Sequence, residues 1–97
     1  MIKLAAIRKD GIIYTGTRHG YIMHNPERPL GYLFNGEQGF ITDTDEFVDR
    51  IAGARIAYEC GQIVKQQDEL YSEDIIEADE EEKRIYNGFV NQMNQSK

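Results

Sequence analysis

The chain has 97 residues, 40% of them hydrophobic and 29% charged, with a formal net charge of −6. This length fits one domain and leaves no room for a second core, and the apolar content excludes a wholly disordered chain. The single cysteine, Cys60, excludes an internal disulfide and a cysteine-based zinc site.

The distribution of charge and apolar residues narrows the class of protein further. Residues 1–65 carry eight basic and eight acidic side chains, whereas residues 66–97 carry three basic and nine acidic ones. We therefore expect no affinity for duplex nucleic acid, which requires a basic face. No apolar run reaches about 18 residues, and Lys3, Arg8 and Lys9 interrupt the apolar start, so we expect neither a membrane span nor a signal peptide.

The first half of the chain begins with a hairpin pattern. Residues 2–8 and 12–15 read as strands around Asp10-Gly11, a pair that tolerates the positive φ angles of a type I′ turn. The pattern next predicts a short helix from Arg18 to His24 with Thr17 as its cap. A proline-containing turn follows at 25–29, and residues 30–34 and 40–42 read as two further strands.

The second half is predicted to be mainly helical. The spacing predicts a helix over residues 43–60, capped by Asp43 or Thr44 and followed by the C-terminal glycine Gly61. Its buried stripe is Phe47, Ile51, Ala54 and Tyr58, and its expected ion pairs are Glu46–Arg50 and Arg55–Glu59.

A short strand at 62–64, a segment at 70–76 docked on the core and a helix over 79–94 complete the expected elements. The last helix should bury a stripe of Ile85, Phe89 and Met93, joined by Tyr86 and Val90, and its acidic start should be solvated. The fold class is α+β: a small antiparallel sheet packed against a core helix. Residues 1–78 form a single domain, and 79–97 form a C-terminal amphipathic acidic helix.

No known catalytic motif occurs in the chain. It has no nucleophile elbow, P-loop or dinucleotide fingerprint, and His19 and His24 are not spaced as a helical zinc pair. The sequence supports a binding site better than a catalytic site. Arg18 and His19 stand at a helix start, and Arg50 and Arg55 offer planar donors for phosphate. Aromatic faces for a base come from three residues: Tyr14, Phe40 and Tyr71. Each of these residues also has an ordinary structural explanation.

Six short segments, in this order, carry a family resemblance. They are Ala-Ala-Ile (5–7), Tyr-Thr-Gly-x-Arg-His (14–19), Gln-Gly-Phe-Ile-Thr (38–42), Phe-Val-Asp-Arg (47–50), Arg-Ile-Ala-Tyr-x-x-Gly-Gln-Ile (55–63) and Leu-Tyr-Ser-Glu-Asp (70–74). Over about residues 3–76 the chain resembles a group of small phage proteins. Within that group it is similar to the anti-Thoeris nucleotide sponges.

The resemblance implies a non-catalytic, cofactor-free and metal-free binder in the cytoplasm of the infected bacterial host. Sponges of this kind hold cyclic ADP-ribose isomers intact between protomers, and some form hexamers that also bind cyclic oligonucleotides. It implies a homo-oligomer, dimer or hexamer, and it implies the following ligand-binding residues: Arg18, His19, Phe40, Arg50, Arg55, Gln62, Tyr71, Ser72, Glu73 and Asp74.

Two departures from the resemblance leave alternatives open. The stretch between His19 and Gln38 is short and contains two prolines, and 23 residues follow Asp74. One alternative is an inhibitor or regulatory module that binds a protein through the acidic C-terminal helix. The other is an enzyme that degrades the same signal, which lacks support from any visible metal cluster or acid–base pair.

Overall fold

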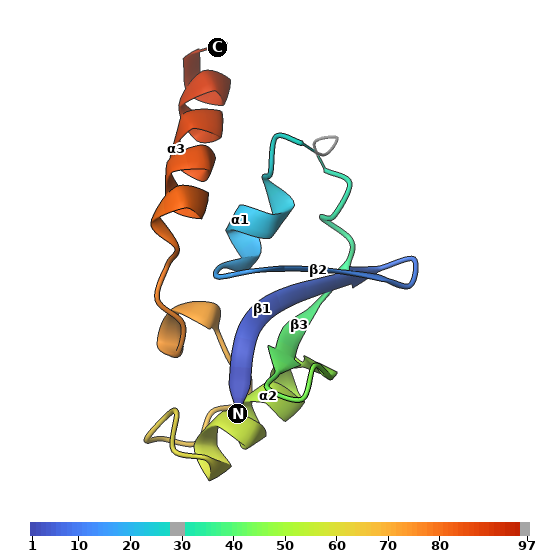
Figure 1. Ribbon diagram of the computed structural model, residues 1–97, viewed down its shortest axis with the longest axis vertical. Coiled ribbons are helices and arrows are strands. Elements are labelled where there is room, and N and C mark those ends of the chain that lie inside the picture. Colours follow the sequence, from blue (N-terminus) through green and yellow to red (C-terminus); the bar gives the residue numbers. More distant parts are fainter. Residues whose placement is uncertain (28–30, 96–97) are drawn as a thin grey trace.

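The computed structural model describes residues 1–27 and 31–95 (Figure 1). Within these residues, four strands, three α-helices and one 3₁₀ turn make up an α+β fold, which confirms the predicted fold class. In chain order the elements are β1 (Ile2–Lys9), β2 (Ile12–Gly16), α1 (His19–Met23), β3 (Glu37–Thr42), β4 (Phe47–Asp49), α2 (Arg50–Glu59), the 3₁₀ turn η1 (Ser72–Asp74) and α3 (Glu80–Gln95).

The strands form one antiparallel sheet in the order β2-β1-β3-β4. The predicted N-terminal hairpin is confirmed: Lys9 pairs with Ile12, and Asp10 and Gly11 have φ angles of 52° and 79°. These positive angles match the twist of the two flanking strands, so the turn itself fixes the register of the hairpin. The central strand β1 then pairs with β3 through partners such as Ala5 and Phe40.

The predicted helix over 43–60 begins seven residues later than expected. Asp45 has a φ of 64° and forms a turn that returns the chain as the short strand β4, so Phe47 and Val48 lie on a strand. The cap is Asp49, whose carboxylate accepts a hydrogen bond from the Ala52 N–H at 2.7 Å. The predictions of Asp43 or Thr44 as cap and of Phe47 in a helical stripe were therefore wrong.

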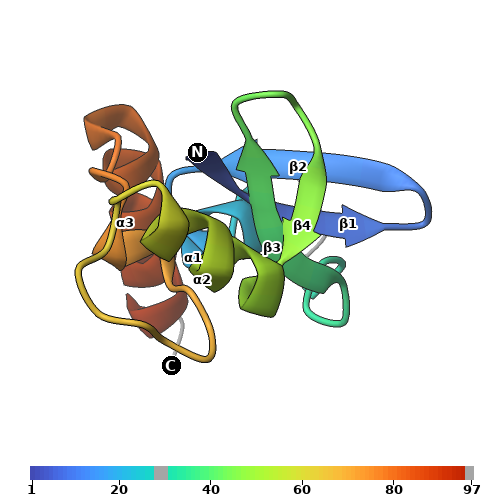
Figure 2. The same ribbon diagram turned by 90° about the horizontal axis from the view of Figure 1, so that it is seen from below.

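Helix α2 packs through small residues, and of the predicted stripe only Ala54 is buried in this helix. Gly53, Ala54 and Ala57 are buried, whereas Ile51 is 65% exposed and Tyr58 is 42% exposed. A methyl group at Gly53 would lie 3.1 Å from Phe40 Cδ2, so the missing side chain lets the helix approach β3 closely (Figure 2). The predicted terminal glycine is confirmed by the φ of 83° at Gly61.

Three smaller predictions of local structure were wrong. Of the strand expected over 30–34, residues 31–34 form turns, and Leu30 lies outside the described residues. Residues 62–64 form no strand, and Val64 is 93% exposed. Thr17 does not cap α1, because Arg18 is the N-cap residue and Thr17 hydrogen-bonds to the C-terminal helix instead.

The core lies between the sheet and the helices. Its largest fully buried side chains are Phe40, Ile7, Leu33 and Leu70. Leu70 belongs to the segment 70–76, and Ile75 and Ile76 pack against the same cluster. The prediction that this segment docks on the core is therefore confirmed.

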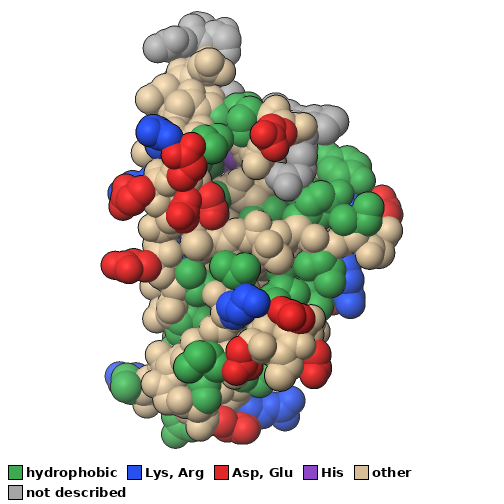
Figure 3. Space-filling model, viewed as in Figure 1, with side chains coloured by type: hydrophobic (Ala, Val, Ile, Leu, Met, Phe, Trp, Pro, Cys, Tyr) green, Lys and Arg blue, Asp and Glu red, His purple; other side chains and the backbone are tan. Residues whose placement is uncertain are grey.

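Helix α3 runs beside α1 and confirms the predicted C-terminal helix (Figure 1). Tyr86 and Phe89 contact the His24 ring, with centroids 5.6 and 6.3 Å apart, whereas Ile85 is 41% exposed and does not belong to the buried stripe. The side chain of Met93 lies outside the described residues. Acidic side chains gather along the outer side of α3 (Figure 3). None of the described helices has both the length and the apolarity needed to cross a membrane.

Candidate functional site

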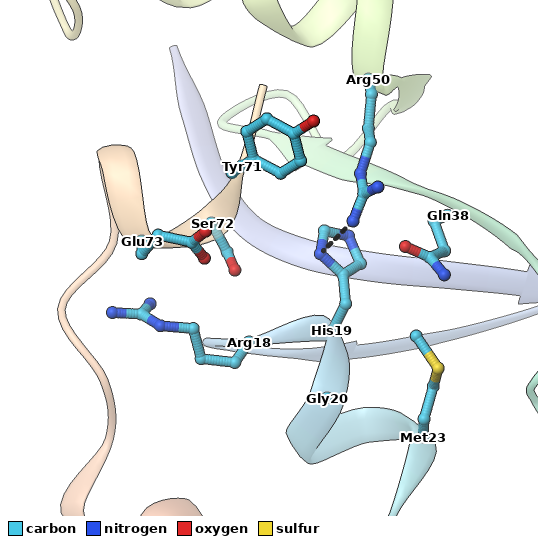
Figure 4. A pocket seen from close by; sticks show the side chains of 9 residues that line it. All are labelled: Arg18, His19, Gly20, Met23, Gln38, Arg50, Tyr71, Ser72 and Glu73. Carbon is cyan, nitrogen blue, oxygen red and sulfur yellow. Dashed lines mark hydrogen bonds between the residues drawn. The ribbon is translucent and has the colours of Figure 1, made fainter. Parts of the chain in front are cut away.

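A cleft of about 270 Å³ opens where the start of α1, β3, the start of α2 and the η1 turn meet (Figure 4). It brings together six of the residues proposed from the sequence, although they come from segments far apart in the chain. The full lining consists of Arg18, His19, Gly20, Met23, Gln38, Arg50, Tyr71, Ser72 and Glu73.

The fold places these side chains through its sheet pairing and its element ends. Arg18 and His19 follow the end of β2 after one intervening residue, and Arg50 is the first residue of α2, directly after β4. A backbone hydrogen bond from the Leu70 N–H to the Arg50 carbonyl, at 3.0 Å, then holds the Tyr71–Ser72 segment beside the start of α2. The cleft therefore forms at the junctions between elements, where side chains of different segments converge.

His19 is buried at the floor of the cleft with both ring nitrogens engaged. Nε2 lies 2.7 Å from the Gly39 carbonyl oxygen, which can only accept, so Nε2 carries the proton. Nδ1 is then free to accept a hydrogen bond from Arg50 Nη2 at 3.3 Å. The ring also packs edge-on against Phe40, with centroids 5.1 Å apart.

The electrostatics of His19 agree with this neutral tautomer. Burial is the largest influence and lowers its pKa from the ordinary value of 6.5; the Gly39 hydrogen bond raises it, the Arg50 charge lowers it, and the Glu73 charge raises it. The imidazole is therefore neutral at pH 7. Because both nitrogens already have partners, His19 is a support for Arg50 and is not poised as a general base.

Arg50 is a half-buried cation without a carboxylate partner. Its Nε is buried and has no hydrogen-bond partner, and its Cζ lies 5.2 Å from the centroid of the Tyr71 ring. The expected pair with Glu46 does not form, because the two residues flank the extended strand β4 rather than one helical turn. A buried donor without a partner is rare in folded proteins and points to a group that is supplied from outside.

Arg18 likewise reaches the cleft without an ion pair. Its Nη1 donates to the carbonyls of Thr17 at 2.7 Å and of Ile76 at 2.6 Å. In the part of the chain that the structure describes, no acidic group lies within 4.0 Å of the guanidinium of Arg18 or Arg50. Both positive charges are therefore available to an anion.

Three further polar side chains line the cleft without using their hydrogen-bonding groups. Within residues 1–27 and 31–95, the side chains of Gln38, Ser72 and Glu73 make no hydrogen bond or ion pair. Ser72 is only 3% exposed. The cleft thus combines two cations that lack an ionic partner with an amide, a hydroxyl and a carboxylate that make no side-chain hydrogen bond.

The other residues proposed from the sequence lie outside this arrangement. Phe40 is fully buried beneath His19 and presents no face to a ligand, which corrects its assignment as a stacking residue. The Gln62 side chain binds the backbone of Ile2, accepting from N at 2.7 Å and donating to O at 2.9 Å. Arg55 lines a separate depression on α2, and Asp74 accepts hydrogen bonds within its own segment.

The sequence reasoning missed Gly20, Met23 and Gln38 as cleft residues. Gln38 could have been found, because it precedes Phe40 by two positions and so shares one face of its strand. For a metal, no group of three or more His, Cys, Asp or Glu side chains among the described residues is suitably placed. The arrangement can bind an anion through charge and hydrogen bonds.

A comparison with protein families places the chain. The family model described as the phage T4 y16D protein matches residues 1–76, a range that contains every residue of the cleft. The chain belongs to the phage T4 y16D protein family. No curated protein and no solved structure matches it. The expectation of a small phage protein is thereby confirmed, whereas the narrower resemblance to anti-Thoeris sponges stays a prediction.

Proposed function

We propose that this y16D-family protein is a non-catalytic binder that sequesters a phosphate-bearing signal of the cyclic nucleotide or cyclic ADP-ribose class. The observation that carries the proposal is the unpaired Arg50 guanidinium, with its buried and unpartnered Nε at the wall of the cleft. We further propose that the protein binds this ligand in the cytoplasm of the infected bacterium and needs neither a cofactor nor a metal.

The charge balance of the cleft favours an anionic ligand. Arg50 is supported by a neutral imidazole and by an aromatic ring, so neither partner cancels its charge. A phosphate would accept the hydrogen bonds that its guanidinium leaves unmade, and such charge-assisted bonds are roughly twice as strong as neutral ones. Tyr71, 43% exposed, has ring surface available to a base or sugar.

The size of the cleft favours a ligand shared between copies of the chain. Pockets for small molecules usually measure about 300–1,000 Å³, and this one, at about 270 Å³, suits a phosphate with one adjoining group. A whole cyclic nucleotide would extend beyond it. We therefore include a homo-oligomer, dimer or hexamer, in the proposal, since a second protomer would complete the site.

Native mass spectrometry with a panel of cyclic nucleotides and ADP-ribose isomers, followed by heat release, tests this proposal. We expect the wild type to retain one class of ligand and to release it with unchanged mass. Arg50→Gln should weaken binding at least about tenfold, because it removes a charge-assisted contact. Arg55→Gln is the matched control, since Arg55 lies on the same helix but outside the cleft.

Three results would overturn the proposal. If the protein bound no member of the panel, cyclic nucleotides and ADP-ribose isomers would be excluded as its ligands. A released ligand of altered mass would favour the enzymatic alternative. Equal affinity of the wild type and Arg50→Gln would show that binding, if present, occurs elsewhere on the molecule.

A further inference from the structure

The cleft has two walls of different chemistry. Arg50 and Gln38 stand on one side, and Ser72 and Glu73 stand on the other, on the η1 turn (Figure 4). The first wall donates hydrogen bonds, whereas the Glu73 carboxylate can only accept them. A ligand that fills the cleft must therefore present an anion to one side and hydrogen-bond donors to the other.

The Ser72–Glu73 wall is held by its own segment rather than by the cations. Leu70, two residues earlier, is fully buried, and the Asp74 carboxylate accepts from the Tyr71 N–H at 3.3 Å and from Gln67 Nε2 at 3.2 Å. Glu73 forms no ion pair with Arg18 or Arg50. The segment is thus anchored on both sides of Ser72 and Glu73 while their side chains remain unpaired.

The charge of Glu73 influences groups inside the cleft, although the side chain is exposed to solvent. Its negative charge is among the influences that raise the pKa of the buried His19, which lies at the cleft floor. A carboxylate at this position repels a phosphate, so Arg50 on the opposite side of the cleft is a more favourable cation for a phosphate than Arg18, which lies on the same side as Glu73 (Figure 4). The same carboxylate favours neutral donors, and the adjacent Ser72 hydroxyl can both donate and accept.

We propose that Ser72 and Glu73 recognise the hydroxyl groups of a ribose whose phosphate lies against Arg50, so that the cleft selects ribose phosphates over deoxyribose phosphates. This inference rests on the proposed function, and it adds a selectivity that a phosphate site alone would not have. A ribose phosphate has the required pair of properties, an anion at one end and neighbouring hydroxyl donors at the other. It also suits a cleft of about 270 Å³ better than a larger nucleotide does.

Calorimetric titration of the full chain with inorganic phosphate, ribose phosphate and deoxyribose phosphate tests the inference. We expect ribose phosphate to bind at least about tenfold more tightly than deoxyribose phosphate, because the deoxy sugar lacks a hydroxyl that can donate to the charged Glu73 carboxylate. Glu73→Gln should reduce this ratio toward one while retaining the affinity for phosphate. Glu77→Gln, at an exposed position outside the cleft, should keep the ratio.

The possible failures distinguish the two proposals. Equal binding of both sugar phosphates, or an unchanged ratio in Glu73→Gln, overturns the ribose inference and leaves the phosphate site standing. An affinity for ribose phosphate that Arg50→Gln does not lower would place the sugar phosphate elsewhere on the molecule and overturn the inference as well. No binding of any of the three probes at millimolar concentration overturns the phosphate site and the inference together.

Discussion

Two neighbouring residues, Thr17 and Arg18, belong to two polar regions that differ in hydrogen bonding. In one region the polar groups bond to one another, and in the other several of them have no partner. Thr17 faces the joint with α3, formed by Thr17, Asp79 and Glu82, and Arg18 faces the cleft. In the joint, the Thr17 N–H donates to Glu82 at 2.9 Å, the Asp79 N–H donates to the Thr17 hydroxyl at 3.0 Å, and the Glu82 N–H donates to the Asp79 carboxylate at 3.0 Å.

The cleft differs because its groups are left open. Arg50 Nε is buried without a hydrogen-bond partner, and the Glu73 carboxylate forms no ion pair among the described residues. Both regions are rich in charge, so charge alone does not separate a structural joint from a binding site. Whether each polar group already has a partner does separate them, because an unmade buried hydrogen bond costs free energy.

The largest expected effect comes from breaking the joint. Glu82→Ala removes the acceptor of the Thr17 N–H and hydroxyl, and we expect it to lower the free energy of unfolding by about 2 kcal/mol. Denaturant unfolding measures this change. The control is Glu81→Ala, which removes only an exposed pair with Arg84 and should cost about 0.5 kcal/mol or less. Equal costs for the two variants would show that the joint does not stabilise the fold.

A pH titration of stability addresses the buried floor of the cleft. Folding lowers the pKa of His19 below its ordinary value of 6.5. At a pH between the folded pKa and 6.5, the unfolded chain therefore binds more protons than the folded chain does. The contribution of His19 to stability is therefore complete above about pH 6.5 and decreases as the pH falls through that window. Thermal unfolding from pH 7 to 5 should show the decrease.

Two histidine variants isolate this effect from the titration of other groups. His19→Gln should remove the part of the pH dependence that is due to the buried ring, whereas His24→Gln should keep it. The charges that act on the ring are those of Arg50 and Glu73, and neither variant changes them. An identical slope in the wild type and His19→Gln would contradict the prediction.

The smallest change in stability is expected at the open wall. Arg50→Met replaces a cation that lacks an ionic partner with an apolar side chain of similar length, so the free energy of unfolding should stay within about 1 kcal/mol of the wild type. Phosphate binding should be lost at the same time. A loss of about 3 kcal/mol in denaturant unfolding would instead assign Arg50 to the structural framework.

Local sequence signals predicted the local structure well. Asp10-Gly11 predicted the hairpin, Gly61 the end of α2, and the acidic run and apolar spacing the helix at 80–95. The start of α2 was missed because Asp45, a residue other than glycine, adopts a positive φ and forms a turn inside an apparently helical pattern. Glu82 was expected to be solvated, but it is half-buried and accepts a hydrogen bond from Thr17, 65 residues earlier in the chain.

The cleft could be predicted only in part. Six residues were named from the motifs and are brought together by the structure: Arg18, His19, Arg50, Tyr71, Ser72 and Glu73. Phe40 and Arg55 were named on the same grounds but lie beneath and outside the cleft, because strand register and helix rotation decide which side chains converge. Neither can be read from a single sequence without knowing where each element begins.

Gly39 contributes both to the packing of the sheet and to the geometry of the cleft. Its carbonyl orients the His19 ring, and a side chain there would collide with the Val48 carbonyl and the Phe47 ring on β4. A mutation at this position would therefore alter the packing of the sheet and the position of the His19 ring at the same time. Gly39 therefore limits how the cleft can change without a change in the pairing of β3 with β4.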